Sequence, residues 1–325
     1  MEDINFVSNK LHSLVAVLAL SIGTLHGQNF DQAARSFNEQ DEKIQQFNFE
    51  QEEIAAEVLP NFFEFKTEYD TTGNARIYSP PYEGGTVRYS DLEFDAYYTH
   101  AFGCSSGISI GAGWCANEIH WRSNPFFNRT QFNNAIFSLT GFTGAIPRWL
   151  WKGGFSTQVD THTWDWSNYA IYNLTIWGRY SYWDNLGIHT GLLGQTGIRK
   201  DKVLPILGFD LTWWDNWQLN MIYPVNMSLV YNIDDAWSVL LAARIMEARY
   251  RLGKEEPLSK GIWQYQNVGT EVGLTYQCGA FAYANFHVGC ASGGDLKISD
   301  FHDHHAIHVK QDATAYVGGS LDIKW

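Results

Sequence analysis

From residue 61 onward, apolar and polar side chains alternate in short runs. In Asn61–Asp70, Phe63, Phe65 and Tyr69 share one parity, and the residues between Phe63 and Tyr69 at the other parity are all charged. Because successive side chains of a β-strand point to opposite faces, this pattern predicts a strand with one apolar and one charged face. The same pattern returns in three later runs, Leu92–Tyr98, Leu207–Trp213 and Val272–Gln277. The chain is therefore predicted to be all-β.

The composition indicates which kind of β protein this is. Charged residues make up only 18% of the 325 residues and aromatic residues 16%, and 29 residues are glycine. A soluble sandwich also alternates, but many such strands with aromatic residues near their ends are typical of a transmembrane antiparallel β-barrel with an apolar outside and a polar lumen. The net charge of −13 excludes a protein that holds nucleic acid through bulk positive charge.

The spacing of turn residues gives a strand count. Short polar breaks at 183–185, 214–216, 232–235 and near 279 alternate with longer ones at 71–85, 122–131, 196–204, 251–261 and 291–311. Outer-membrane barrels have short turns at one end and long loops at the other. About 14 strands are expected, or 12 if the region of Pro224 does not reverse the chain. The break at 145–154 is long for the short-turn end.

Three segments are expected along the chain. Residues 1–27 have the layout of a secretory signal peptide, in which Lys10 precedes the short apolar run Leu11–Leu20. Residues 28–60 form an acidic periplasmic segment, either a weak amphipathic helix or a solvated arm. Residues 61–325 form the barrel, which places the protein in the bacterial outer membrane.

The last run of the chain is amphipathic and ends in an aromatic residue. Val317, Leu321, Ile323 and Trp325 share its apolar face. Such a final strand resembles the signal by which the barrel-assembly machinery recognises outer-membrane proteins. An exposed apolar strand must be inserted before it aggregates, so this machinery is the expected partner, together with outer-membrane lipid.

A further resemblance covers roughly residues 145–325. The run LGFDLTWWDNWQLNMIYPVNMSLVYNIDDAWSVLLAAR, residues 207–244, resembles an uncharacterised family of porin-like outer-membrane barrels. The Cys-containing, aromatic-rich style is similar to that of chlamydial-type outer-membrane proteins. The resemblance implies an outer-membrane barrel, and it implies no substrate or active residue.

Charged residues that alternate with the apolar ones are expected to line the lumen, because Lys or Arg facing lipid near the midplane costs about 2–4 kcal/mol. Facing charges would select permeants, whereas a sealed internal salt-bridge network is the alternative. The pore-lining candidates are Glu64, Lys66, Glu68, Glu93, Asp95, Arg179, Asp210, Arg244 and Glu271.

Two other groups of residues offer weaker chemistry. His302, His304, His305 and His308 are weak metal candidates, but a solvated polar loop is favoured, and no metal or cofactor is expected. The exported cysteines are Cys104, Cys115, Cys278 and Cys290, which leave a homo-oligomer, disulfide cross-links between chains or free thiols open. Pairing of Cys278 with Cys290 is not expected, because one strand separates them.

The functional prediction is a porin-like passive channel or a surface structural protein. Two alternatives come from other classes. The first is an outer-membrane lipid hydrolase, for which His189 or residues 302–308 would need a serine partner that no recognisable motif supplies. The second is a soluble exported β protein that stacks its aromatic residues on sugars. We expect no enzyme activity.

Overall fold

The computed structural model describes residues 61–102, 105–214 and 216–325. The expected signal peptide (1–27) and acidic segment (28–60) lie outside these residues. Within the described ranges, no helix has the length and apolarity to cross a membrane.

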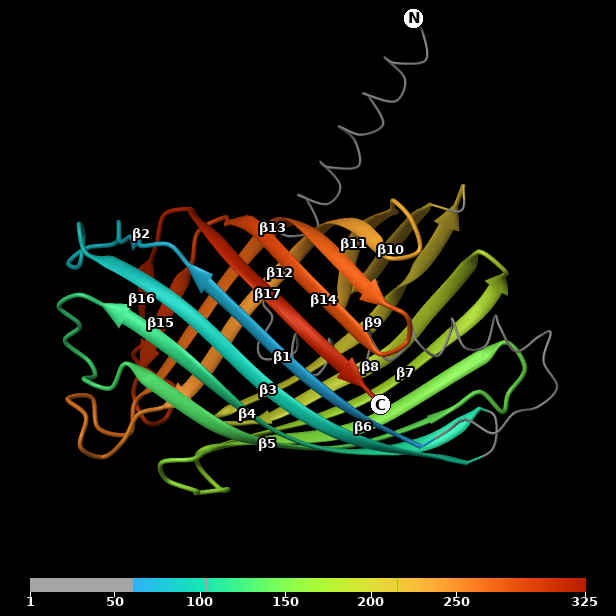
Figure 1. Cartoon of the computed structure of the whole chain (residues 1–325). Coiled ribbons are helices and arrows are strands. Elements are labelled where there is room, and N and C mark those ends of the chain that lie inside the picture. Colours follow the sequence, from blue (N-terminus) through green and yellow to red (C-terminus); the bar gives the residue numbers. More distant parts are fainter. Residues whose placement is uncertain (1–60, 103–104, 215) are drawn as a thin grey trace, which may run out of the picture.

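All regular elements of the described residues are strands, and they form one antiparallel sheet that closes on itself (Figure 1). Three pairs, β1 with β2, β14 with β15 and β16 with β17, are single wall strands with a short break, so the barrel has 14 strands. The strands are β1 (Phe62–Thr72), β2 (Ala75–Arg76), β3 (Thr86–Phe102), β4 (Ser106–Trp121), β5 (Gln131–Thr143), β6 (Trp149–Asp160), β7 (Ala170–Trp183), β8 (Leu186–Gly197), β9 (Lys200–Trp213), β10 (Trp217–Tyr223), β11 (Asn226–Asn232), β12 (Trp237–Arg251), β13 (Ile262–Cys278), β14 (Ala282–Ala291), β15 (Asp295–Ser299), β16 (Ile307–Lys310) and β17 (Thr314–Lys324).

The expected all-β barrel and the higher strand count are confirmed. The chain reverses at Pro224, where β10 and β11 form an antiparallel hairpin. Three expected breaks were wrong in length: residues 196–204 contain only a tight turn, residues 291–311 contain β15 and β16, and β6 already begins at Trp149. In each case the alternation continues through Gly, Pro or charged residues that a count of turn residues takes as a loop.

Closure of the barrel depends on β17, which pairs with β14 on one side and with β1 on the other. The backbone amides and carbonyls of Phe63 and Trp325 exchange two hydrogen bonds, of 2.8 and 3.0 Å, and their rings stack with centroids 6.2 Å apart. We call this end of the barrel the terminus end and the opposite end the loop end. The first and last strands therefore leave no open edge.

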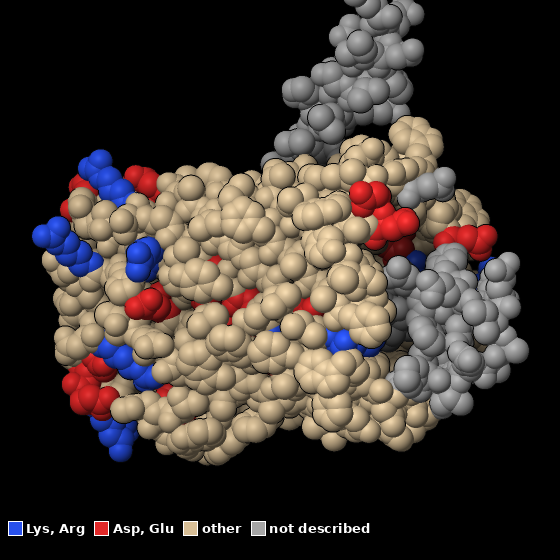
Figure 2. All heavy atoms as spheres, in the orientation of Figure 1, with Lys and Arg blue, Asp and Glu red and all other residues tan. Residues whose placement is uncertain are grey.

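The outer surface over most of the barrel is apolar. Figure 2 shows a broad band with few charged atoms, whereas charged atoms gather at the loop end, on the left, and again on the right. These outward side chains include Phe94, Ile110, Phe137, Leu139, Phe155, Leu174, Ile176, Leu192, Leu207, Phe209, Val272, Leu274, Phe286, Val288, Val317 and Leu321. A closed barrel with such a band is a structure for a lipid bilayer, because water would make this surface unstable.

At the loop end the arrangement of polar and apolar side chains is reversed, with apolar side chains inward and charged ones outward. On β3, the inward residues Asp91, Glu93 and Asp95 give way to buried Val87 and Tyr89, while the outward neighbour Arg88 is exposed to solvent. The same reversal occurs on β12, where inward Arg244 is followed by buried Met246, Ala248 and Tyr250. We call this apolar-cored end of the barrel the cap, made of residues 77–90, 117–133, 246–266 and 291–313.

The cap is filled by aromatic rings from opposite parts of the wall. Tyr89 on β3 stacks on Tyr265 on β13 with centroids 4.3 Å apart, and Phe132 on β5 packs at 4.8 Å from Trp263 on β13. The backbone amides of Asn128 and Arg129 also donate to the carboxylate of Glu256. In the barrel order, β5 and β13 are almost diametrically opposed, so these contacts cross the interior.

Strand length explains why a cap can form. A tilted transmembrane strand needs about 9–11 residues, whereas β3 and β13 have 17, β4 has 16 and β12 has 15. By contrast β10 and β11 have only 7 each, so β12 is paired with β11 only as far as Ala243. The part of β12 beyond Ala243 is therefore not paired with β11, and it lies towards the interior together with β13.

We expect Trp325→Asp to leave export intact and to reduce the amount of assembled barrel. The change removes the ring that stacks on Phe63 and places a carboxylate at the apolar terminus end of the barrel, beside the closing strand. The measurement is the fraction of mature chain that migrates as a heat-modifiable band. Trp164→Asp, at an exposed loop position, is the control. Equal assembly of the two variants would contradict this role of Trp325.

Candidate functional site: the barrel lumen

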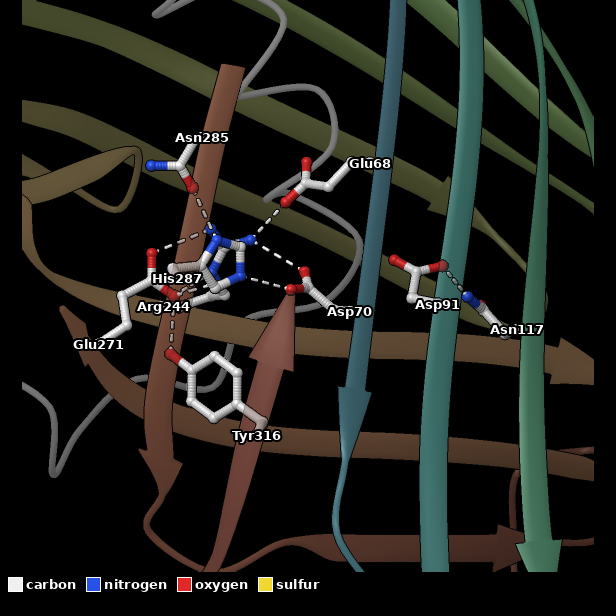
Figure 3. Close-up of polar contacts among 9 residues, drawn as sticks. All are labelled: Glu68, Asp70, Asp91, Asn117, Arg244, Glu271, Asn285, His287 and Tyr316. Atoms are coloured by element: carbon white, nitrogen blue, oxygen red, sulfur yellow. Dashed lines mark hydrogen bonds and ion pairs between the residues drawn. The ribbon is translucent and has the colours of Figure 1, made fainter. Parts of the chain in front are cut away.

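The most connected interior residue is Arg244 on β12, which joins carboxylates from both sides of the lumen (Figure 3). Its guanidinium donates to both oxygens of Glu271 on β13, at 2.6 and 3.0 Å. It also donates to Glu68, at 2.5 Å, and to Asp70, at 3.0 Å, both on β1. Three wall strands separate β12 from β1, so one buried cation holds two parts of the barrel together.

His287 on β14 completes this network and is fully buried. Its Nε2 lies 2.6 Å from Asp70 Oδ1, and its Nδ1 lies 2.7 Å from Asn285 Oδ1. Both ring nitrogens of His287 therefore have a side-chain partner inside the barrel. Tyr316 on β17 donates to Glu271 at 2.8 Å. The site therefore combines one guanidinium and one imidazole with three carboxylates.

Glycine makes room for the network. Gly318 on β17 lies directly over the Asp70–His287 pair, and a Cβ at this position would overlap Asp70 Oδ1. A strand glycine of this kind marks a close approach that any other residue would prevent. Gly187 on β8 has the same relation to Arg179 and Asp210.

A second polar cluster lies on the opposite wall. Arg179 on β7 donates to both oxygens of Asp210 on β9, at 2.7 and 2.6 Å. His189 on β8 lies between them, with Nε2 2.5 Å from Asp210 and Nδ1 accepting from Trp177 Nε1 at 2.9 Å. Both ring nitrogens of His189 are therefore engaged, one by Asp210 and the other by Trp177.

An acidic column runs between these clusters along β1 and β3. In the register of the two strands, Glu68 is opposite Glu93, and Lys66 is opposite Asp95. Asp91 accepts a hydrogen bond from Asn117 on β4. The column contains the carboxylates of Glu64, Glu68, Asp70, Asp91, Glu93 and Asp95, and Lys66 is the cation among them. The lumen at this height therefore holds more acidic than basic side chains.

The structure places all nine pore-lining candidates on the inward parity of their strands. It brings Glu68, Arg244 and Glu271 into one network and Arg179 with Asp210 into another, and it leaves Glu64, Lys66, Glu93 and Asp95 along the column. Sequence reasoning missed Asp70, Asp91, His287 and Tyr316. Inward parity within the same runs could have found the first two, but nothing in the local sequence singles out His287 or Tyr316.

The histidine-rich loop does not gather its side chains around one point. His305 Nδ1 lies 2.8 Å from Asp300, and His308 Nδ1 lies 2.6 Å from Asp295. Among the described residues, no group of three or more His, Cys, Asp or Glu side chains is arranged to hold a metal ion. The loop is exposed, as its polar composition suggested.

The described cysteines are free thiols. Cys115 is buried inside the barrel, with Sγ 3.9 Å from the Tyr250 hydroxyl, whereas Cys278 and Cys290 are exposed. Cys104 lies outside the described residues. Cross-links between chains stay a prediction.

Comparison with known proteins gives distant relatives. No protein-family model matches the chain. It is 26% identical over 286 residues to an uncharacterised protein of Chlamydia pneumoniae, covering 83% of this chain and 89% of that protein. It is 21% identical to an uncharacterised protein of Chlamydia trachomatis serovar D, covering 80% and 86%. The resemblance to chlamydial proteins is therefore confirmed.

Similar solved structures are an outer-membrane channel from Pseudomonas putida F1 and a mutant of TodX, a monoaromatic hydrocarbon channel. The first has a TM-score of 0.47 and 7% identity and covers 84% of this chain and 98% of its own. The second has a TM-score of 0.40 and 8% identity and covers 82% and 90%.

The chain is an outer-membrane β-barrel. The apolar band, the closed 14-strand sheet and the charged interior carry this conclusion, because bacterial barrels of this kind span the outer membrane. The band also speaks against the alternative of a soluble sugar-binding protein, since its aliphatic and aromatic side chains would face water there.

We expect Arg244→Ala to lower the free energy of unfolding by about 3–5 kcal/mol, because it leaves buried carboxylates without their cation. The measurement is the urea midpoint of the heat-modifiable band. Arg244→Lys should restore only part of the loss, since an ammonium cannot donate to Glu271 with a planar fork. The exposed Arg122→Ala is the control. An Arg244→Ala midpoint equal to that of wild type would contradict the network's role.

Two carboxyls of the loop at 300–306 should titrate low. Hydrogen bonds from His305 and from backbone amides lower the pKa of Asp300 to about 2. Burial acts to raise the pKa of Asp303, but hydrogen bonds from Lys297 and Ser299 and the charge of Arg249 outweigh it and bring the pKa to about 2. Because both values lie below the ordinary value, these contacts stabilise the loop above about pH 4 and are lost as the pH falls towards 2. Carboxyl titration by NMR measures this, and midpoints near 4 would contradict it.

Proposed function

We propose that this protein is a passive channel whose acidic lumen favours cations and small neutral solutes over anions. The observation that carries the proposal is the column of carboxylates on β1 and β3, which faces a polar interior inside an apolar cylinder. Rings or columns of carboxylates attract cations and repel anions at close range. We further propose that the loop end faces outward, since outer-membrane barrels place their longer loops there.

The opposing interpretation is a surface structural protein with a sealed interior. Arg244 and Arg179 form salt bridges with several of the carboxylates, and the cap covers part of the loop end. Glu93 and Asp95 distinguish the two interpretations. They belong to the acidic column, and their replacement changes ion selectivity only if ions pass along the column.

The test is planar-bilayer conductance of refolded protein in a KCl gradient. The channel should show stepwise openings with a reversal potential on the cation-selective side. Glu93→Gln with Asp95→Asn should move that potential towards zero, because two acidic groups of the lumen are lost. The matched control is Glu83→Gln with Glu118→Gln, which removes the same charge from the cap's loops and outer surface. A silent bilayer from folded protein would overturn the channel and leave the structural role.

For assembly we propose that β17 is the strand read by the barrel-assembly machinery. Val317, Leu321 and Ile323 are outward and partly exposed, and β17 closes the sheet against β1. A partner that receives the chain before closure would meet this apolar face first. Loss of cross-linking between the machinery and the Trp325→Asp chain would support this, and unchanged cross-linking would contradict it.

A further inference from the structure

Residues 246–266 and 291–313 of the cap contact the barrel wall on two sides, and the two attachments differ in strength. The broad side is the apolar core shared with β3, β4 and β5, which includes 18 buried residues. The narrow side meets the segment we call the rim, made of residues 161–171 and 198–199. The loop-end parts of β12 and β13 form one hairpin. One face of this hairpin belongs to the broad side, and the other face belongs to the narrow side.

The burial pattern establishes this placement. A wall strand has one face towards the outside, but residues 248–253 and 261–265 are buried without interruption. Tyr250 and Trp263 face the broad side, where they contact Phe132 on β5. Ile262 faces the narrow side, where it packs with Ile171 and Ile198. One face of the hairpin thus contacts β5, and the other contacts β7 and the turn between β8 and β9. Both contacts are possible only if the hairpin lies inside the barrel.

Two buried arginines hold the narrow side. Arg249 donates through Nε and Nη2 to the carbonyl of Ile198, at 3.1 and 2.8 Å, and it is braced from the cap by Gln264 and Asp303. Arg251 donates to the carbonyl of Asn168 at 2.8 Å. Both side chains are almost fully buried, with 1% and 2% of their area exposed. The rim side of each of these bonds is a neutral carbonyl. The charged pair between rim and cap, His162 with Glu255 at 3.7 Å, is exposed to solvent.

The contacts beside these bonds are few. Tyr169 donates to the carbonyl of Leu252 at 3.1 Å, Arg199 lies over the Phe301 ring at 5.1 Å, and Ile171, Ile198 and Ile262 form the apolar part. β12 beyond Ala243 has no ladder to β11 within the described strands, so no sheet hydrogen bonds resist separation there. The narrow side is therefore the weaker of the cap's two attachments.

We propose that the seam between cap and rim is the gate of the channel, and that Arg249 and Arg251 are its latch. The gate opens when residues 246–266 and 291–313 of the cap separate from the rim as one body and keep their aromatic core against β3–β5. This inference rests on the proposed channel function and names the element that regulates it. The acidic lumen below the cap sets which ions pass, and the latch sets how often the passage is open.

The test combines conductance with thiol labelling. In a Cys104→Ser, Cys278→Ser, Cys290→Ser background, Ile262→Cys places a thiol in the seam and Cys115 stays as a thiol on the core side, next to Tyr250. Arg249→Gln with Arg251→Gln should raise maleimide labelling at position 262 and channel open probability by about tenfold or more, since one lost charged hydrogen bond has this effect. Cys115 should stay protected, because the core does not separate.

The matched control is Arg88→Gln with Arg122→Gln, which removes two exposed cap arginines outside the seam and should behave as wild type. If the latch variant does not fold into a heat-modifiable barrel, Asp303→Asn, which removes one brace of Arg249, should give a smaller increase in the same direction.

Three outcomes would overturn the gate, and they are distinguishable. Unchanged labelling at position 262 with normal conductance leaves the channel and removes the latch. Faster labelling of both position 262 and Cys115 indicates loosening of the whole cap and not a seam. Faster labelling at position 262 with no conductance in any variant shows a mobile cap over a barrel that conducts nothing, which overturns the proposed function as well.

Discussion

The whole structure depends on which face of each strand is apolar. In the bilayer, a strand must show apolar side chains outward and satisfy its backbone within a closed sheet. Residues 61–72 do this with aromatic residues outward and charges inward, and β17 returns to pair with them. Every charge on these strands is thereby forced into one confined space, and the lumen networks follow from that confinement.

Confinement also explains why the interior charges are paired. A carboxylate inside the cylinder has lost much of its water, so each needs a cation or several donors. Arg244 serves Glu68, Asp70 and Glu271 at once, and Gly318 leaves the space that His287 needs to reach Asp70. Stability and permeation then compete for the same groups, because a carboxylate that is bridged is less available to an ion.

The barrel could be predicted from alternation, but the cap could not. Parity within single runs was enough to place Glu64, Glu93 and Asp95 inside. Nothing in the sequence marks the change at Arg244–Met246 from a charged to an apolar interior, because a local pattern does not say what lies opposite. His287 and Tyr316 were missed for the same reason, since their partners Asp70 and Glu271 lie 217 and 45 residues away.

The buried arginines separate permanent from reversible attachments. Arg244 and Arg179 face carboxylates, so breaking either bond would leave two opposite charges in a poorly solvated interior. Arg249 and Arg251 meet the rim through carbonyls, and Arg249 keeps its carboxylate partner Asp303 on the cap when the rim departs. Separation at the seam therefore strands no carboxylate. A barrel that must hold its wall closed and still open its mouth needs both kinds of bond, and this chain places the first in the lumen and the second under the cap.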